Sequence, residues 1–240
     1  MALWRTNSMA RYLIIAASSA IGQSVTELLQ KQGDEVFTTA QSKEKITPDF
    51  ILDGTDFGAV DKVFEQAGPL DGVVNCAGSL LIKSAHTTSY EEFQKTINAS
   101  LTTSFAVVHA AGKRMTHGGS VVLIASAAAL TGLANHEAIA AAKAGIIGLA
   151  QSAAATYASS NLRINVVAPG MVKTPLTESL LNNQLIARAS TAMHALGRIG
   201  ESADIARAIL FFLNPSNNWI TGQVLAVDGG LSSVRPKLKV

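Results

Sequence analysis

The chain has 240 residues, of which 19 are basic and 17 acidic, giving a formal net charge of +2, and 48% of its residues are hydrophobic. This apolar content is enough for a large core and excludes a disordered chain, and the length suits one α/β domain. No run of Lys and Arg reaches the density of a nucleic-acid-binding surface, so we expect no nucleic-acid partner. The single cysteine, Cys76, cannot form an intramolecular disulfide, which favours the cytoplasm.

The N-terminal residues imitate a signal peptide only loosely. Arg5 and Arg11 precede an apolar run at 12–17 that is too short for a signal sequence, and a Ser/Gly turn follows it at once. We see no apolar stretch near the ~20 residues that a membrane span needs, so we expect a buried first strand and no membrane association. Residues 1–10 are interpreted as an extension. Whether residues 1–8 are native, or Met9 is the natural start, stays open.

Short β-branched runs alternate with helical periods along the chain. Apolar residues at helical spacing predict a helix that ends near Gly33, another around 60–67, and a long Ala-rich helix over 138–159. The predicted strands lie at 12–17, 36–39, 50–53, 71–75, 121–126, 164–168 and 224–227. Strand–helix alternation of this kind favours an α/β fold: one Rossmann-like, doubly wound parallel sheet over 11–231 with helices on both faces, followed by a basic tail at 232–240.

Three segments carry the pattern of an active site: GSVVLIAS at 119–126, IAAAK at 139–143 and RINVVAPGMVKTP at 163–175. Together they resemble the short-chain dehydrogenase/reductase family. In that family a strand ends in a catalytic Ser, Tyr-x-x-x-Lys follows about thirteen residues later, and a Pro-Gly loop holds the nicotinamide. Ser126 and Lys143 occupy the Ser and Lys positions, whereas the Tyr position holds Ile139. An aliphatic side chain has no proton to give, so the usual acid/base is missing.

The first turn, IAASSAIG at 15–22, departs from the family pattern Thr-Gly-x-x-x-Gly-x-Gly. Only Gly22 is kept, and Ala16 and Ala20 replace the other two glycines. The start of the following helix still favours a pyrophosphate, although by itself the turn fits an ordinary strand–helix connection equally well.

The remaining motifs extend the resemblance over roughly residues 10–231. Residues 75–78, Asn-Cys-Ala-Gly, match the family's Asn-Asn-Ala-Gly, Asp53 follows the third strand where the family binds adenine, and the Pro-Gly loop matches the nicotinamide-binding segment. Cys76 is interpreted as a small buried residue rather than a nucleophile. The resemblance implies a dinucleotide site formed by Ser18, Ser19, Ile21, Gly22, Lys43, Asp53, Asn75, Ala77, Gly78, Lys143, Pro169, Gly170, Val172 and Thr174.

The second predicted strand ends without the acidic residue that usually binds the ribose hydroxyl of NAD. Ser42 and Lys43 could instead meet a 2′-phosphate, so NADP(H) is slightly favoured over NAD(H). A solvated loop charge is an equally good interpretation of Lys43.

In the family the Lys binds the nicotinamide ribose and lowers the pKa of the Tyr, and the Ser orients the substrate carbonyl. When residues 93–101 and Phe105 are aligned with the family's helix, Ser100 occupies the position of the family's further Asn. Asn98 lies two residues earlier, roughly 200° around a helix. His136, seven residues before Lys143, is the best local candidate for a substitute acid, or else a cap or surface residue. Glu137 fits a first-turn charge equally well. Tyr157 lies roughly 20 Å beyond Lys143 along the helix and cannot replace the missing Tyr.

Two functions remain open. The first is an NAD(P)-dependent oxidoreductase acting on a small carbonyl or alcohol with a non-standard or missing proton donor. The second is a non-catalytic dinucleotide-binding sensor or scaffold. We expect a lid helix over 177–194, no metal, and a homotetramer or homodimer that pairs through the helix from Ala138, whose small residues are Ala141, Ala142, Gly145, Gly148 and Ala153. The substrate is not specified by the sequence.

Overall fold

The computed structural model describes residues 9–235, so residues 1–8 of the predicted extension and residues 236–240 of the basic tail lie outside the described residues. Seven strands form one sheet in the order β3-β2-β1-β4-β5-β6-β9, and every neighbouring pair is parallel. The doubly wound Rossmann-like fold is therefore confirmed. The strands are β1 (Arg11–Ile15), β2 (Glu35–Ala40), β3 (Phe50–Ile51), β4 (Gly72–Asn75), β5 (Gly119–Ile124), β6 (Leu162–Pro169) and β9 (Val224–Val227).

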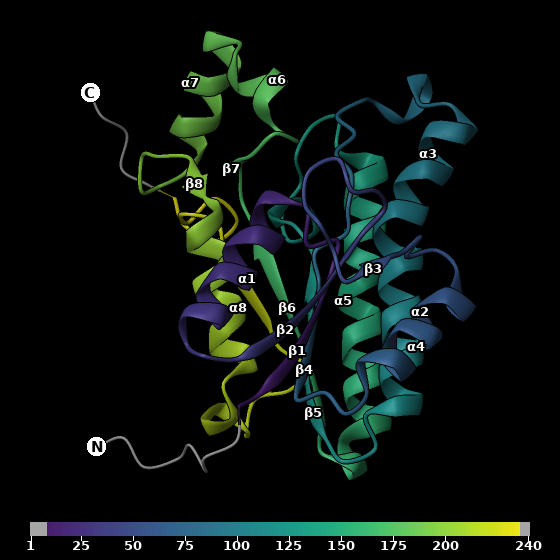
Figure 1. The fold of residues 1–240 in the computed structure, drawn as a ribbon. Helices are drawn as coiled ribbons and strands as arrows, with labels where there is room; N and C mark the ends of the chain where they lie inside the picture. The colour runs from purple at the N-terminus through teal and green to yellow at the C-terminus, as the bar shows by residue number, and fades with distance from the viewer. Residues whose placement is uncertain (1–8, 236–240) are drawn as a thin grey trace.

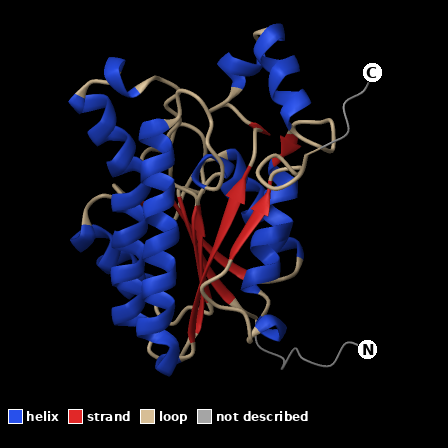
Figure 2. Ribbon diagram, turned by 180° about the vertical axis from the view of Figure 1, so that it is seen from behind, coloured by secondary structure: helices blue, strands red, loops and turns tan. Residues whose placement is uncertain are grey.

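Helices cover both faces of this sheet (Figures 1 and 2). One face carries α1 (Ala20–Lys31) and α8 (Ser202–Leu213). The other carries α2 (Phe57–Ala67), α4 (Thr103–Arg114) and α5 (Glu137–Tyr157), with α3 (Tyr90–Ile97) leading into α4. Above the carboxyl ends of the strands lie α6 (Glu178–Leu181), α7 (Gln184–Met193) and a small parallel pair that the sequence did not predict, β7 (Val172–Lys173) with β8 (Gly200–Glu201).

The two faces of the sheet build two separate hydrophobic cores. Along β1, Leu13 and Ile15 belong to the core under α2, α4 and α5, while Tyr12 and Ile14 belong to the core under α1 and α8. Successive side chains of a strand point to opposite faces, so one apolar run supplies both cores. This explains why the strands read as continuous apolar segments rather than alternating ones.

The turn between β1 and α1 keeps the geometry of a glycine turn although its first glycine position is alanine. Ala16 has a positive φ of 58°, a region that costs an L-residue roughly 1–2 kcal/mol. Ser19 caps α1, since its Oγ accepts the Gly22 amide at 3.0 Å. A β-carbon on Gly22 would lie 2.8 Å from the carbonyl oxygen of Ala16, so the one retained glycine is required by packing.

The helix that carries Ser100 is not a regular α-helix. A π-helical segment, Asn98–Thr102, separates α3 from α4, and Ser100 lies at its centre with no exposed surface. The sequence-based angle between Asn98 and Ser100 assumed an α-helical advance and does not apply here. π-helical turns occur often at functional sites.

The single lid helix expected over 177–194 is wrong. The segment forms two helices, α6 and α7, that are separated at Asn182 and Asn183. The Asn183 side chain accepts the amides of Leu185 and Ile186 and so starts α7 afresh. Leu185 and Ile186 are themselves exposed, so α7 does not turn its apolar residues to the protein as the amphipathic pattern suggested.

The long helix meets a criterion that the sequence reading overlooked. Residues 137–160 are long and apolar enough to cross a membrane by length and composition, with a mean hydropathy of 1.4, and 44% of that window is buried inside the fold. A core helix meets the same criterion, and α5 packs against β6 and α4. Within residues 9–235 no group of three or more His, Cys, Asp or Glu side chains is placed to hold a metal ion.

We predict that the two alanines of the first turn respond in opposite directions to glycine. Ala16→Gly relieves the positive φ and should stabilise the protein by about 0.5–1 kcal/mol. Ala20→Gly, at the first position of α1 with ordinary helical geometry, should destabilise it by up to about 1 kcal/mol. Denaturant midpoints at one protein concentration measure both, and an equal loss of stability in the two variants would contradict the strain at Ala16.

Candidate functional site

The backbone amides at the start of α1 are available to an anion. Those of Ser18, Ala20 and Ile21 donate to no other residue in the described part of the chain, whereas the Gly22 amide is used by Ser19. Free amides at the N-terminus of a twelve-residue helix favour a phosphate group. The turn therefore fits the pyrophosphate of a dinucleotide even with Ala16 and Ala20 in place of glycine.

Two further predicted residues line the same edge of the sheet. Asn75, at the end of β4, is buried, accepts the Ala77 amide through Oδ1 at 3.1 Å and donates to Ser104 Oγ, also at 3.1 Å. It thereby fixes the start of the Ala77–Gly78 segment against α4. Asp53 lies two residues beyond β3 and is exposed. Hydrogen bonds from the Thr55 amide and hydroxyl to Oδ1 lower the pKa of Asp53 and leave Oδ2 available.

Lys143 is the central charged group of the site. Its side chain comes from the second turn of α5 and is 5% exposed, and Nζ donates to the Ile124 carbonyl at the end of β5 over 2.8 Å. No carboxylate pairs with it among residues 9–235. Burial lowers the pKa of the Lys143 ammonium to about 8, and the nearby Cys76 thiol opposes this slightly. Burial raises the pKa of Cys76 to about 12, so the thiol stays protonated at neutral pH.

Lys143 shares its surroundings with Gly78 and Ser100. A β-carbon on Gly78 would lie 3.2 Å from Lys143 Nζ and 4.0 Å from Ser100 Oγ. The Ser100 hydroxyl is fully buried and has no hydrogen-bond partner among the described residues. Two of the three Nζ–H donors of Lys143 are likewise unused. A polar group that bound beside Gly78 would satisfy these donors, as a ribose hydroxyl would.

Ser126 lies two residues beyond β5 and caps a short 3₁₀ turn, Ala127–Ala129, by accepting the Ala128 amide at 3.2 Å. Its hydroxyl proton is not used in that bond, so it can be donated to a substrate oxygen. Ile139 lies one helical turn before Lys143 on α5 and is 3% exposed. The structure thus places Ser126 and Lys143 at the same strand end, with an aliphatic side chain where the family motif has its phenol.

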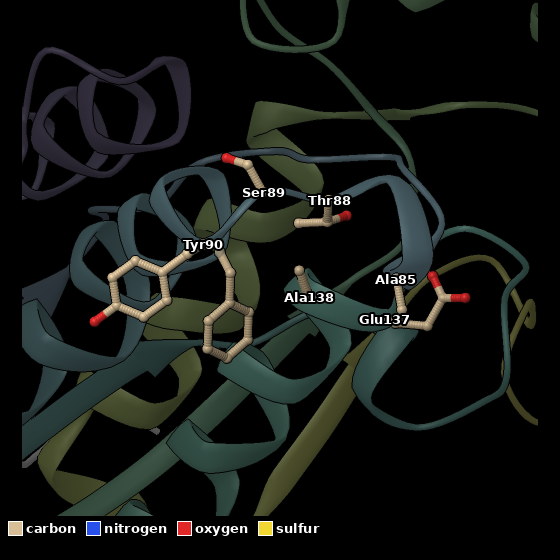
Figure 3. A pocket seen from close by; sticks show the side chains of 7 residues that line it. Ala85, Thr88, Ser89, Tyr90, Glu137 and Ala138 are labelled. Atoms are coloured by element: carbon tan, nitrogen blue, oxygen red, sulfur yellow. The ribbon is translucent and has the colours of Figure 1, made fainter.

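The groups considered as substitute acids lie at the start of α5. His136 is the residue before the helix and is partly exposed, with Nδ1 2.7 Å from the Ala134 carbonyl. Glu137 is exposed in the first turn and lines a pocket of about 310 Å³ between α5 and α3, together with Tyr90 and Ala138 (Figure 3). None of the predicted catalytic residues lines this pocket.

Tyr157 is remote from the site, as predicted. Its ring packs against Gly112 of α4, where no β-carbon would fit. Gly112 lies near the end of α4, and Tyr157 is the last residue of α5.

The Pro-Gly loop, residues 169–171, leaves β6 at the same edge. Thr174 donates its amide to Thr177 Oγ1 at 3.1 Å, and the Thr177 hydroxyl donates to the Val172 carbonyl, so Thr174 and Val172 are fixed beside the loop. Sequence reasoning missed His194, whose Nε2 accepts the Met171 amide at 3.1 Å. A lone histidine in a variable segment gave no signal that could have identified this contact.

Lys43, the candidate ligand for a 2′-phosphate, lies just after β2 and has no ion-pair partner among the described residues. Lys43 is exposed in the loop after Ala40 and makes no ion pair with any described residue. A carboxylate bound to β2 belongs to Asp49, which accepts the Thr38 amide and hydroxyl at 2.8 and 2.7 Å. Asp49 therefore bonds two residues before the strand end and does not replace the missing acid there.

The fold and the free amides, buried lysine and Pro-Gly loop at one sheet edge define a dinucleotide-binding protein of the Rossmann class. The family profile described as enoyl-(acyl carrier protein) reductase matches residues 53–232. The chain belongs to the short-chain dehydrogenase/reductase family of NAD(P)-dependent oxidoreductases, and it is an oxidoreductase of this type.

Individual relatives cover almost the whole chain. The 3-oxoacyl-[acyl-carrier-protein] reductase FabG of Thermotoga maritima is 32% identical over 91% of this chain and 96% of its own length. Carbonyl reductase family member 4 of Danio rerio is likewise 32% identical over 91% and 96%. Among solved structures, ElxO with NADP bound superposes with a TM-score of 0.87 at 29% identity, covering 95% of this chain and all of that one.

Proposed function

We propose that this protein transfers hydride between NADP(H) and a small carbonyl or alcohol substrate, using a proton donor other than the usual tyrosine. The observation that carries the proposal is the cluster of Lys143 Nζ, Gly78 and Ser100 Oγ beside Ser126. These unused donors lie near the carboxyl ends of the strands, where the backbone amides of the first turn are also free. The names of the relatives are consistent with carbonyl reduction, and ElxO is a relative that binds NADP.

Each residue has a role that its geometry allows. The nicotinamide, when bound, supplies or accepts the hydride. Lys143 Nζ would donate its free hydrogens to the ribose of the cofactor, and the Pro-Gly loop with Thr174 would hold the carboxamide. The Ser126 hydroxyl donates to the substrate oxygen and so polarises the carbonyl. Ser18, Ile21 and Gly22 form the phosphate-binding turn, and Asp53 holds the adenine.

The proton that the substrate oxygen needs must come from another group than Ile139. Lys143 is one candidate, because burial lowers the pKa of its ammonium towards the range in which a general acid works at neutral pH. His136 is the second candidate, since imidazole titrates in the physiological range. A Tyr-to-Phe variant of ElxO has been solved with NADPH bound. That relative therefore binds its cofactor after the loss of one tyrosine hydroxyl, which supports cofactor binding by this chain with Ile139.

The alternative is a dinucleotide-binding protein that does not turn over. It requires the same phosphate turn and the same Lys143 contacts, so binding alone does not separate the two functions. Saturable NADPH binding combined with no oxidation or reduction across a wide panel of carbonyls and alcohols would favour a sensor or scaffold. Turnover of any of them favours the enzyme. We further propose that the protein works in the cytoplasm.

We predict that NADPH binds modestly more tightly than NADH. Lys43 is free to pair with the 2′-phosphate, and an exposed pair of this kind contributes up to about 1 kcal/mol, or roughly fivefold in affinity. Calorimetric titration of both cofactors measures the ratio. Lys43→Ala should abolish the preference, whereas Lys45→Ala in the same loop should keep it. Tighter binding of NADH, unchanged in Lys43→Ala, would contradict the assignment.

We predict that Ile139→Tyr creates or sharply raises carbonyl reductase activity. The phenol would lie one helical turn from Lys143, whose positive charge lowers a phenol pKa, and a positioned acid contributes about 10²–10⁴-fold. Ile139 is buried, so overpacking could cost about 1–3 kcal/mol and the variant's unfolding must be measured first. Ile139→Phe is the matched control, because it has the ring without the proton.

His136→Ala completes this experiment. Loss of wild-type activity in His136→Ala, with no gain in Ile139→Tyr, would show that His136 is the acid and that the vacant-acid interpretation is wrong. A folded, cofactor-bound Ile139→Tyr variant that stays inert on every carbonyl would instead point to Ser100 in place of the family's Asn, or to a site that no longer admits substrate.

We also propose that the protein forms a homotetramer or homodimer through α4 and α5. Of the small residues on α5, Ala142 and Ala153 are buried within the subunit, while Ala141 and Gly148 are exposed. A β-carbon on Gly148 would meet no atom within 4 Å. The aromatic ring of Phe105 on α4 is also 49% exposed. An exposed face of this kind allows another helix to approach closely.

We predict that Gly148→Glu weakens this assembly, because it places bulk and charge on the exposed face of α5. Light scattering across micromolar concentrations should give a wild-type mass at least twice the 25.0 kDa of one chain and a smaller mass for the variant. Gln30→Arg, on the exposed side of α1, is the control and should leave the mass unchanged. A wild-type monomer at every concentration would contradict the proposal.

A further inference from the structure

His194 connects three separate parts of the sheet edge. It directly follows α7 and is 3% exposed. Its Nδ1 lies 2.6 Å from the Ser190 carbonyl within α7, and its Nε2 lies 3.1 Å from the Met171 amide in the Pro-Gly loop. The imidazole is therefore held between α7 and the Pro-Gly loop, and both of its ring nitrogens form hydrogen bonds.

The chemistry of the two partners fixes where the imidazole carries its proton. A carbonyl oxygen only accepts, so Nδ1 must carry a hydrogen. A backbone amide only donates, so Nε2 must offer a lone pair. Both contacts are satisfied together only by the neutral imidazole protonated at Nδ1. Protonation of Nε2 would set two N–H groups against each other and remove the only acceptor that the Met171 amide has within residues 9–235.

The ring also forms the packing surface of the Pro-Gly loop. A β-carbon on Gly170 would lie 2.6 Å from His194 Nε2 and 2.9 Å from the Cα of Asp228. On the other side, a β-carbon on Gly229 would lie 3.4 Å from His194 Cβ. The imidazole is thus wedged between the Pro-Gly loop and the turn after β9, and a change in its position must move one of them.

The charged groups around the ring favour its protonated form in an alternative position. Asp228, in the turn after β9, and Arg198, in the loop after α7, line the same cavity of about 380 Å³ as His194. Arg198 is paired with Asp204 at 2.7 Å. Burial opposes ionisation of Asp228, but hydrogen bonds from the Ser232 side chain and from the Ser232 and Gly230 amides outweigh it, so the pKa of Asp228 is lowered and the carboxylate stays ionised. An imidazolium would therefore find an anion beside it.

We propose that His194 is a positioning residue that holds the Pro-Gly loop in its dinucleotide-binding geometry only while its imidazole is neutral. The inference rests on the proposed function, because it assigns the loop to the nicotinamide. Acidification protonates Nε2, breaks the bond to the Met171 amide and draws the ring towards Asp228. Cofactor affinity then decreases as the pH is lowered, although the phosphate-binding first turn at 15–22 contains no titratable side chain.

The binding test compares three proteins between pH 7.5 and 5.5 by calorimetric titration with NADPH. Wild type should lose roughly tenfold in affinity between these two pH values. His194→Gln keeps an acceptor for Met171 and a donor for Ser190 but does not titrate, so it should bind like wild type at pH 7.5. At pH 5.5 it should lose clearly less affinity than wild type, and the loss that the two share is that of the 2′-phosphate of NADPH taking up a proton. His194→Leu has no acceptor and should bind weakly at both. The control, His117→Gln, alters an exposed histidine before β5 and should keep the wild-type slope.

A second readout needs no cofactor and keeps the two proposals apart. Nitrogen-15 NMR of the imidazoles should show His194 as the Nδ1–H tautomer at pH 7.5. Hydrogen exchange at the Met171 amide should be slow at pH 7.5 and accelerate at pH 5.5, after correction for intrinsic rates, in wild type but not in His194→Gln. An Nε2–H tautomer, or the same pH slope in wild type and His194→Gln, overturns the inference. If NADPH fails to bind at pH 7.5 while these spectra are as expected, the proposed function fails and the contact at His194 stands.

Discussion

The parallel direction of all seven strands in the main sheet is the constraint on which the site depends. Parallel strands bring every carboxyl end to one edge, and helices on both faces leave that edge as the place where polar groups can collect. The free amides after β1, Asn75 at the end of β4, Ser126 shortly after β5 and the Pro-Gly loop after β6 meet there for this reason. Residues more than a hundred positions apart become neighbours because each lies at or shortly beyond the end of a strand.

A single buried ammonium sets the electrostatics of this edge. Lys143 has lost most of its contact with water, has one hydrogen bond and has no carboxylate to balance its charge in the described chain. Burial of an unpaired charge is costly, and the unpartnered hydroxyl of Ser100 adds a second unsatisfied group. Both unsatisfied groups lie where, in the proposed function, a polar ligand would bind and satisfy them.

The sequence predicted the strands and the position of Lys143 well because these depend on local pattern. The apolar runs that became β4 and β5, and the spacing from Ser126 to Lys143, are set by strand and helix periods that any reader can count. It failed where geometry departs from those periods. The π-helical turn at Ser100, the break at Asn182 and Asn183, and the contact from His194 to Met171 all depend on tertiary neighbours.

The same distinction explains the two misjudged segments. The apolar character of α5 is spread over many alanines and interrupted by polar residues. For this reason the sequence showed no continuous apolar run, although the helix is long and apolar enough by length and composition to cross a membrane. In α7, apolar residues at helical spacing suggested a covered face. The helix instead begins after Asn183, whose side chain accepts the Leu185 and Ile186 amides, and both of these apolar side chains are exposed. A periodic pattern predicts that a helix forms; it does not predict what the helix faces.

The π-helical segment has a consequence for how the chain can change in length. A π turn holds about one more residue than an α turn, so α3 and α4 are out of phase by roughly the 100° that one residue adds. Deleting one residue between 98 and 102 would let the segment close into continuous α-helix without cutting either neighbour. That deletion would change the rotation of α3 relative to α4 at the point where Ser100 lies, while leaving every remaining residue of the site unaltered in identity. Chemistry at this edge can therefore be gained or lost by an insertion or deletion, a route that comparisons of substitutions alone do not reveal.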